Sequence, residues 1–151
     1  MTIYTIGHST RTIDEFIEML KSFHIKRLVD IRTLPGSKRY PWFNSENLSV
    51  SLKDAGIDYI YMKDLGGLRK KSADSVNLGW HNLSFRNYAD YMQTAEFKAG
   101  LAELLGLAIK EPTCIMCAEA VPWRCHRSLV ADALLVRSID VRHIMANDKA
   151  N

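Results

Sequence analysis

Residues 114–127 hold the densest group of reactive side chains in the chain, in the run C-I-M-C-A-E-A-V-P-W-R-C-H-R. The run starts as a short apolar segment typical of a buried strand and ends where a helix is predicted. A thiol that follows a strand, near cations and a helix terminus, is stabilised as the reactive thiolate. We therefore expect Cys117 to be a nucleophile and Glu119 a general acid or base, whereas Cys114, inside the strand, is interpreted as a core residue.

The thiols of Cys117 and Cys125 also suit other roles. Cys117 could pack as a small buried hydrophobe. The loop between the two cysteines could bring both sulfurs together for thiol–disulfide chemistry, or for a divalent metal bound by Cys117, Cys125, His8 and Glu119. The spacing is not a zinc signature, and Cys125 and His126, expected about 100° apart on one helix, would not share a metal. The cysteine-x5-arginine loop of tyrosine phosphatases is absent, since the first arginine after Cys117 is Arg124.

Residues at other predicted strand ends favour an anionic ligand. His8 follows a glycine at the end of the first predicted strand, where a backbone approaches a ligand easily, although His8 and Ser9 could also cap the next helix. Arg127, in the first turn of the last helix, would add a guanidinium to the free N–H groups there. Its alternative is a salt bridge to Asp30 or Glu119.

The loop over residues 32–44 interleaves basic and aromatic side chains, a combination suited to holding phosphates and stacking a base. A second basic stretch, R-K-K at 69–71 followed by Trp80 and His81, supports a phosphorylated or nucleotide-like substrate. Such charge runs are also commonly solvated faces, and loop aromatics often cover a core. The candidates for catalysis are Cys117, Glu119 and His8, and those for substrate binding are Ser9, Arg32, Ser37, Arg39, Tyr40, Arg69, Cys125, His126 and Arg127.

Alternating strand and helix patterns must position these groups. Strands are predicted at residues 3–6, 28–31, 57–62, 113–116 and 139–145, where β-branched and apolar residues gather. Helical spacing predicts helices from Thr12, where Glu15 completes a capping box, from residue 45, after residue 84 with a break near Thr94, and over 125–136. Residues 63–84 show no clear period, which predicts a functional loop or lid, and the tail from residue 146 is expected to fray.

This alternation requires crossover connections and hence a mainly parallel sheet. We expect one α/β domain over residues 1–151: a three-layer, Rossmann-like sandwich with a five-stranded sheet in the order 3-2-1-4-5 and helices on both faces. Ligands of such sheets bind at the carboxyl ends of the strands, where the strand order reverses. His8 would then face Cys117 across one crevice, with Arg32 beside them.

Composition narrows the class of protein. The chain has 151 residues, 47% of them hydrophobic, and a net charge of +3, which suits one ordinary core. The absence of a membrane-length apolar run and of a signal-peptide pattern predicts a cytoplasmic protein with no membrane partner, whose three cysteines stay reduced. A G-x-G-x-x-G after the first strand and a phosphate-binding loop are both missing, so we expect no dinucleotide and no ATP in its usual cradle.

Three motifs in this order resemble the bacterial and archaeal family called domain of unknown function 488: T-I-G-H-S at 5–9, D-I-R-x-x-P-x-S at 30–37 and C-A-E-x-x-P-x-x-C-H-R at 117–127. The resemblance covers nearly the whole chain. It implies a small α/β cytoplasmic protein whose motifs gather at the strand ends, without a settled activity. The matching positions are Gly7, His8, Ser9, Asp30, Arg32, Pro35, Ser37, Cys117, Glu119, Cys125, His126 and Arg127.

These observations lead us to expect an enzyme that acts on an anionic small molecule, phosphorylated or nucleotide-like, with Cys117 as nucleophile or metal ligand. One alternative is a nucleic-acid-binding module that uses the basic and aromatic loops. A second alternative is a metal-binding protein, in which the thiols hold a divalent cofactor.

Overall fold

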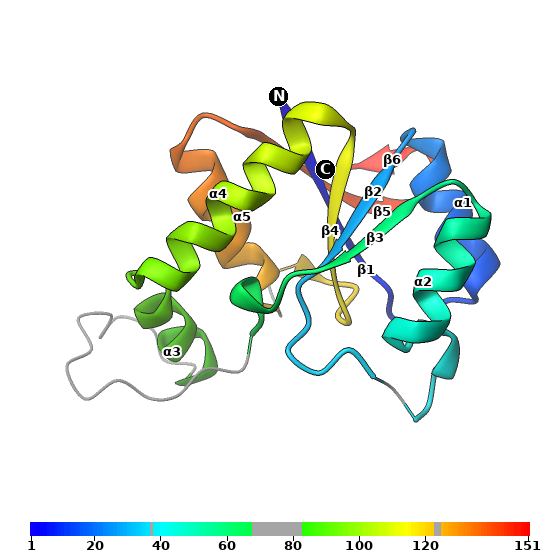
Figure 1. The fold of residues 1–151 in the computed structure, drawn as a ribbon, viewed down its shortest axis with the longest axis horizontal. Helices are drawn as coiled ribbons and strands as arrows, with labels where there is room; N and C mark the ends of the chain where they lie inside the picture. Colours follow the sequence, from blue (N-terminus) through cyan, green and yellow to red (C-terminus); the bar gives the residue numbers. More distant parts are fainter. Residues whose placement is uncertain (37, 68–82, 123–124) are drawn as a thin grey trace.

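The computed structural model describes residues 1–36, 38–67, 83–122 and 125–151. Several predicted features lie outside the described residues: Ser37, Arg124, the basic and aromatic residues between 69 and 81, and most of the predicted lid. The described chain is an α/β structure with a six-stranded, mostly parallel sheet and five α-helices (Figure 1).

The strands are β1 (Thr2–Gly7), β2 (Arg27–Asp30), β3 (Asp58–Tyr61), β4 (Thr113–Cys117), β5 (Asp140–Ala146) and β6 (Lys149–Ala150). They lie in the order β3-β2-β4-β1-β5-β6, and every neighbouring pair is parallel except β5 with β6. The tail does not fray as expected. It pairs with β5, and the backbones of His143 and Asn151 exchange hydrogen bonds of 2.8 and 2.9 Å.

The predicted strand order was wrong, because β4 lies between β2 and β1. All of β4 is buried, whereas Thr2 and Tyr4 of β1 are partly exposed. A strand that is apolar on both faces belongs in the centre of a sheet covered by helices on both sides. The predicted pairing of the first and fourth strands is confirmed, with Gly7 opposite Cys117. Cys117 therefore lies between the strand that leads to Arg32 and the strand that leads to His8.

The helices are α1 (Ile13–Ser22), α2 (Ser45–Asp54), α3 (Leu83–Tyr91), α4 (Ala95–Lys110) and α5 (Arg127–Val136). The predicted capping box is confirmed, since Thr12 and Glu15 exchange two backbone-to-side-chain hydrogen bonds of 3.1 Å. The predicted break near Thr94 is also confirmed, because Thr94 caps α4. In the described part of the chain, no helix combines the length and the apolar character needed to span a membrane.

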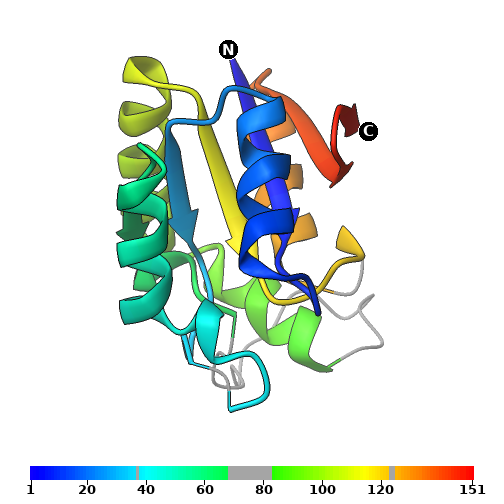
Figure 2. The same cartoon turned by 90° about the vertical axis from the view of Figure 1, so that its right-hand side faces the viewer.

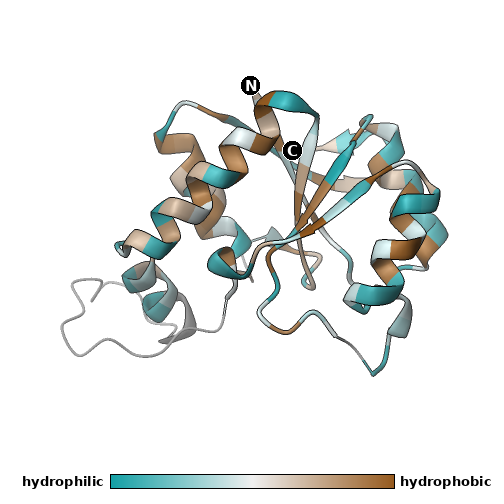
Figure 3. Cartoon of the chain, viewed as in Figure 1, coloured by the Kyte–Doolittle hydropathy of each residue, from teal (hydrophilic) through white to brown (hydrophobic). Residues whose placement is uncertain are grey.

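Helices cover both faces of the sheet, α1 and α2 on one side and α4 and α5 on the other (Figures 1 and 2). Each face of the sheet packs a separate hydrophobic core, and alternate residues of β4 belong to each of them. Cys114 and Met116 pack with α1 and α2, whereas Ile115 and Cys117 pack with α4 and α5. Hydrophobic and hydrophilic stripes alternate along these helices in Figure 3, as expected for helices with one buried face. Cys114 is fully buried, which confirms its interpretation as a core residue.

The loops that follow β1, β2 and β4 gather at one edge of the sheet (Figure 2). The pairing of β1 with β4 continues into these loops, because His8 N–H donates to the Cys117 carbonyl at 3.0 Å and Ser9 N–H to that of Ala118 at 2.9 Å. Gly7 permits this close approach. A Cβ at this position would clash with the backbone carbonyl of Glu119, which a strand cannot easily avoid.

We predict that Gly7→Ala lowers the free energy of unfolding by about 2–3 kcal/mol or more, because the new methyl group meets backbone rather than a flexible side chain. Urea denaturation would measure the change. Gly106→Ala is the control, since its Cβ meets no atom within 4 Å in the interior of α4. This control should be stabilised by up to about 1 kcal/mol. Equal stability of Gly7→Ala and the wild type would contradict the close contact.

Candidate functional site

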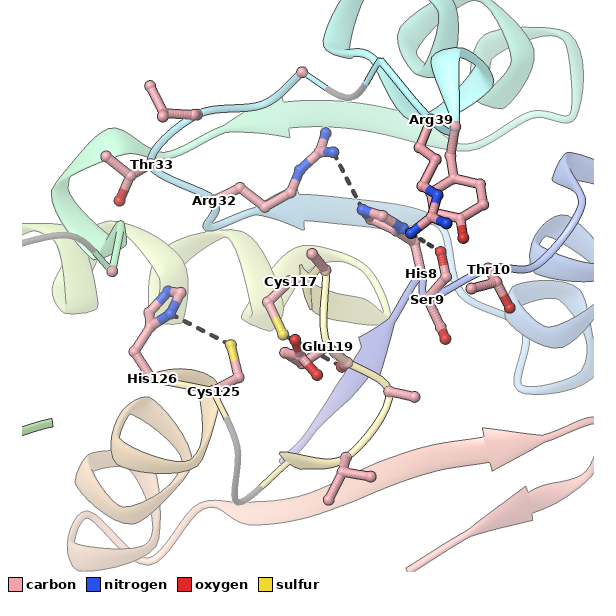
Figure 4. A pocket seen from close by; sticks show the side chains of 17 residues that line it. His8, Ser9, Thr10, Arg32, Thr33, Arg39, Cys117, Glu119, Cys125 and His126 are labelled. Atoms are coloured by element: carbon pink, nitrogen blue, oxygen red, sulfur yellow. Dashed lines mark hydrogen bonds between the residues drawn. The ribbon is translucent and has the colours of Figure 1, made fainter. Parts of the chain in front are cut away.

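A cavity of about 790 Å³ opens at the edge of the sheet where β1, β2 and β4 end (Figure 4). Its lining includes most of the residues predicted for the site: His8, Ser9, Arg32, Arg39, Tyr40, Cys117, Glu119, Cys125 and His126. Ser37 and Arg69 lie outside the described residues. Arg127 does not line the cavity.

Asp30, at the end of β2, anchors one wall of the cavity. Its fully buried carboxylate accepts hydrogen bonds from the backbone N–H of Arg32 at 3.0 Å, from Arg32 Nε at 2.9 Å and Nη2 at 2.7 Å, and from the Tyr59 hydroxyl at 2.6 Å. Burial alone would lower the pKa of Arg32, but the hydrogen bonds and charge of Asp30 outweigh burial and raise it. Arg32 is therefore a fixed cation whose charge is already balanced.

His8 is held as a neutral imidazole between Arg32 and Ser9. Its Nδ1 lies 2.9 Å from the Ser9 carbonyl, which can only accept, so Nδ1 carries the proton. Its Nε2 then accepts from Arg32 Nη1 at 3.4 Å, and its ring stacks on Phe43 with centroids 4.3 Å apart. The pKa of His8 is lowered to about 4. Burial is the largest cause, and the charge of Arg32 lowers the pKa further. His8 therefore orients the wall of the cavity, and its lone pair faces a cation rather than a thiol.

Cys125 and His126 form a thiol–imidazole pair immediately before α5. The sequence predicts a helix from Cys125 and hence divergent side chains, but α5 begins at Arg127, and Cys125 Sγ lies 3.4 Å from His126 Nδ1. The other ring nitrogen, Nε2, lies 2.9 Å from the Ile31 carbonyl and must donate to it. His126 Nδ1 is thus free to accept the thiol proton, and a third group orients the base, as nucleophilic catalysis requires.

Cys117 and Cys125 interact directly, and their pKa values move in opposite directions. The neighbouring thiol of Cys117 is the main cause that lowers the pKa of Cys125 to about 4, assisted by His126 and by the Arg127 backbone N–H, 3.5 Å from Sγ. Burial, and then the hydrogen bond to Cys125, raise the pKa of Cys117 well above its ordinary value. The geometry thus favours Cys125 as the thiolate, against the expectation that Cys117 is the activated thiol. A cysteine at the start of a predicted helix was a signal in the sequence that could have pointed to Cys125.

Arg127 is a buried cation without a carboxylate partner. It is 0% exposed, its Nη2 donates to the Ala120 carbonyl at 3.2 Å, and its Nε and Nη1 have no hydrogen-bond partner within the described residues. The predicted alternatives, direct contact with an anion in the cavity and a salt bridge to Asp30 or Glu119, are both absent from the described structure. Arg127 lies on the buried face of α5, so its side chain is inside the fold and contacts the loop that follows β4. Its charge lowers the pKa of Cys117 and so opposes part of the effect of burial.

Glu119 and Arg39 are exposed side chains of the cavity wall. Neither forms an ion pair with another described residue. The backbone carbonyl of Glu119, in contrast to its exposed carboxylate, lies 3.5 Å from the buried Cys117 Sγ. Arg39 places a positive charge beside the cavity without an ion pair to a described carboxylate, whereas the charge of Arg32 is balanced by Asp30.

The aromatic side chains of the 32–44 loop mostly cover the core. Phe43, in a short 3₁₀ helix (Pro41–Phe43), is fully buried, and Trp42 Nε1 donates to the Arg11 carbonyl at 2.9 Å. Tyr40 alone among these three lines the cavity. The loop therefore offers little aromatic surface for stacking a base.

The described residues contain no group of three or more histidine, cysteine, aspartate or glutamate side chains that could hold a metal. Of the predicted ligands, Cys117 and Cys125 are close together, but His8 directs Nε2 at Arg32. The expected metal set is therefore not assembled by these residues.

We predict that Asp30→Asn lowers the free energy of unfolding by about 3–5 kcal/mol, because it leaves the buried Arg32 cation without its counter-ion. Tyr59→Phe removes one hydrogen bond to the same carboxylate and keeps the ion pair, so the expected loss is about 1–2 kcal/mol. Urea denaturation of both variants measures the difference. Equal losses would show that the ion pair is not the dominant interaction.

Comparison with known proteins supports the resemblance seen in the motifs. No curated protein and no solved structure matches the chain. A family model described as Domain of unknown function DUF488 matches residues 12–134, which include Asp30, Arg32 and the 117–127 motif but not the first motif at 5–9. Because the match covers most of the chain, the protein belongs to the family of Domain of unknown function DUF488.

Proposed function

We propose that the protein is a thiol-dependent enzyme that acts on a small anionic substrate in the cavity, with Cys125 as the nucleophile. The observation that carries this proposal is the thiol–imidazole pair: Cys125 Sγ lies 3.4 Å from His126 Nδ1, and the Ile31 carbonyl orients the ring. Both side chains line the same cavity. A nucleophile, a base and an orienting group are the minimum set for covalent catalysis.

In this mechanism, Cys125 passes its proton to His126 and attacks the electrophilic atom of the substrate. The start of α5 supports the thiolate, because the Arg127 N–H points at Sγ and the helix dipole favours negative charge there. Cys117 keeps its proton, because burial raises its pKa well above the ordinary value, and its Sγ lies 3.5 Å from the Glu119 carbonyl. This arrangement retains the enzyme expected from the sequence and moves the nucleophilic role from Cys117 to Cys125.

The inference that the substrate is anionic rests on Arg39. Its guanidinium lines the cavity without an ion pair to the described residues, so its field is available to a ligand. The exposed carboxylate of Glu119 is a proton shuttle for a leaving group on the same wall. The nucleic-acid and metal-binding alternatives gain no comparable support, since Trp42 and Phe43 pack inward and the described residues do not assemble a metal site.

Alkylation by iodoacetamide tests the nucleophile. We predict that Cys125 reacts at a rate nearly independent of pH above about pH 6, because its thiolate is lost only as the pH falls through its lowered pKa of about 4. An ordinary cysteine would slow about tenfold per pH unit below its pKa of about 8.5. Peptide mass spectrometry identifies the alkylated residue.

Matched variants sharpen this test. Cys117→Ser and His126→Ala should each raise the apparent pKa of Cys125, because they remove or weaken interactions that lower it. Cys114→Ala, in the core, should leave the profile unchanged. Preferential labelling of Cys117, or a Cys125 profile that rises only above about pH 8, would refute the proposed nucleophile.

A comparison of two alkylating reagents tests the anionic preference. We predict that the ratio of iodoacetate to iodoacetamide rates at Cys125 falls roughly threefold to tenfold in Arg39→Gln at low salt, because the variant loses attraction for the carboxylate of iodoacetate. The difference should shrink as salt is added. Lys38→Gln is the control, since Lys38 is exposed in the same loop but does not line the cavity. Equal ratios in the two variants would remove Arg39 from substrate binding.

A further inference from the structure

The proposed nucleophile has a second thiol as its nearest reactive neighbour. Cys117 and Cys125 line the same cavity and belong to the same buried cluster, and their sulfurs lie close together in Figure 4. Both cysteines are free. A nucleophile for acyl or phosphoryl transfer does not need a second thiol at this position, and such a neighbour would compete with water for a covalent intermediate.

The backbone holds the two cysteines in place from opposite sides. Cys117 ends β4 and is fixed by its pairing with Gly7 and by the His8 N–H bond to its carbonyl at 3.0 Å. Cys125 is fixed before α5, where its N–H donates to the Pro122 carbonyl at 3.2 Å and its carbonyl accepts from Ser128 N–H at 3.1 Å. The two fixed segments thus bring both thiols into one cavity, which is what exchange between two cysteines requires.

We infer that the protein reduces small anionic disulfides in this cavity by thiol–disulfide exchange. Cys125 is the attacking thiolate and Cys117 is the resolving thiol. This inference rests on the proposed function and specifies its substrate class. The positive charge of Arg39 selects the carboxylates of the substrate. The remaining requirement, a second thiol beside the first, is met by Cys117, which lines the same cavity.

The exchange proceeds in two balanced steps. The Cys125 thiolate attacks one sulfur of R–S–S–R′, so that a Cys125–S–R bond forms, the substrate S–S bond breaks and R′–S⁻ leaves. The sulfur of Cys117 then attacks Cys125 Sγ, forms the Cys117–Cys125 disulfide and releases R–S⁻. The leaving thiolates take up the proton of Cys117 and the proton that Cys125 had passed to His126. The substrate is thereby reduced by two electrons, and the protein dithiol is oxidised by two.

The charge of Arg127 favours the second step of the exchange. Cys117 must lose its proton before it attacks, and burial opposes this loss. The buried guanidinium has no carboxylate partner among the described residues, so its charge is available to stabilise the developing thiolate of Cys117. A buried ion pair would have neutralised this effect.

The test uses the reduced full-length protein and oxidised glutathione, a small disulfide with several carboxylates, with acid quenching and peptide mass spectrometry. The wild type should form the Cys117–Cys125 disulfide and release two equivalents of reduced glutathione. Cys117→Ser should stop at a mixed disulfide on Cys125, because the resolving thiol is missing. Cys125→Ser should form neither product, and Cys114→Ala should behave as the wild type. Circular dichroism checks that each variant is folded.

The outcomes separate the inference from the proposed function. If Cys125 keeps its low-pH alkylation but the wild type gives no Cys117–Cys125 disulfide, the inference is overturned and the thiol-dependent enzyme stands. If Cys125 does not alkylate at low pH, both are overturned. Cystamine, a cationic disulfide, tests the charge preference: Arg39→Gln should slow the reaction with oxidised glutathione and not that with cystamine. Equal effects on both disulfides would overturn the anionic substrate class.

Discussion

Four hydrogen-bond donors converge on the buried carboxylate of Asp30, and the orientation of both histidines of the cavity depends on this convergence. Asp30 fixes the guanidinium of Arg32, whose Nη1 reaches His8 Nε2. The residue between them, Ile31, is tied to β4 through the Met116 carbonyl at 3.0 Å and accepts from His126 Nε2 at 2.9 Å. Because a buried charge without its partner is costly, Asp30 and Arg32 hold this segment in one conformation. The segment in turn selects the tautomer of each imidazole.

The two imidazoles have different properties because different groups face their lone pairs. The lone pair of His8 faces a cation in a buried site, which lowers its pKa and makes it a poor base. The lone pair of His126 faces the thiol of Cys125. The same contrast separates the cysteines: Cys125 lies before a helix with donors aimed at its sulfur, whereas Cys117 ends a fully buried strand. The pKa of Cys125 is therefore lowered and that of Cys117 raised, which is why Cys125 is the proposed nucleophile.

Much of the site was predictable because the ends of parallel strands meet at one edge of a sheet. His8 and Arg32 follow two strands, Cys117 ends a third, and all of them line one cavity. The strand order was less accessible, since β1 and β4 are both apolar and only their burial on two faces distinguishes the central strand. The burial of Arg127 was also not predictable from the sequence. A position in the first turn of a helix does not reveal whether the side chain faces the solvent or the interior.

The sequence by itself determined the α/β alternation, the capping box of α1 and the short motifs that carry the reactive groups. These features depend on residues close together in the chain, where periodicity and local hydrogen bonding decide the outcome. Only the tertiary structure decided which thiol has the lowered pKa. That choice depends on a helix that begins at Arg127, on a carbonyl of Ile31 that orients His126, and on contact between Cys117 and Cys125. The pKa of a thiol is set by the groups that surround it in space, and those groups come from distant parts of the chain.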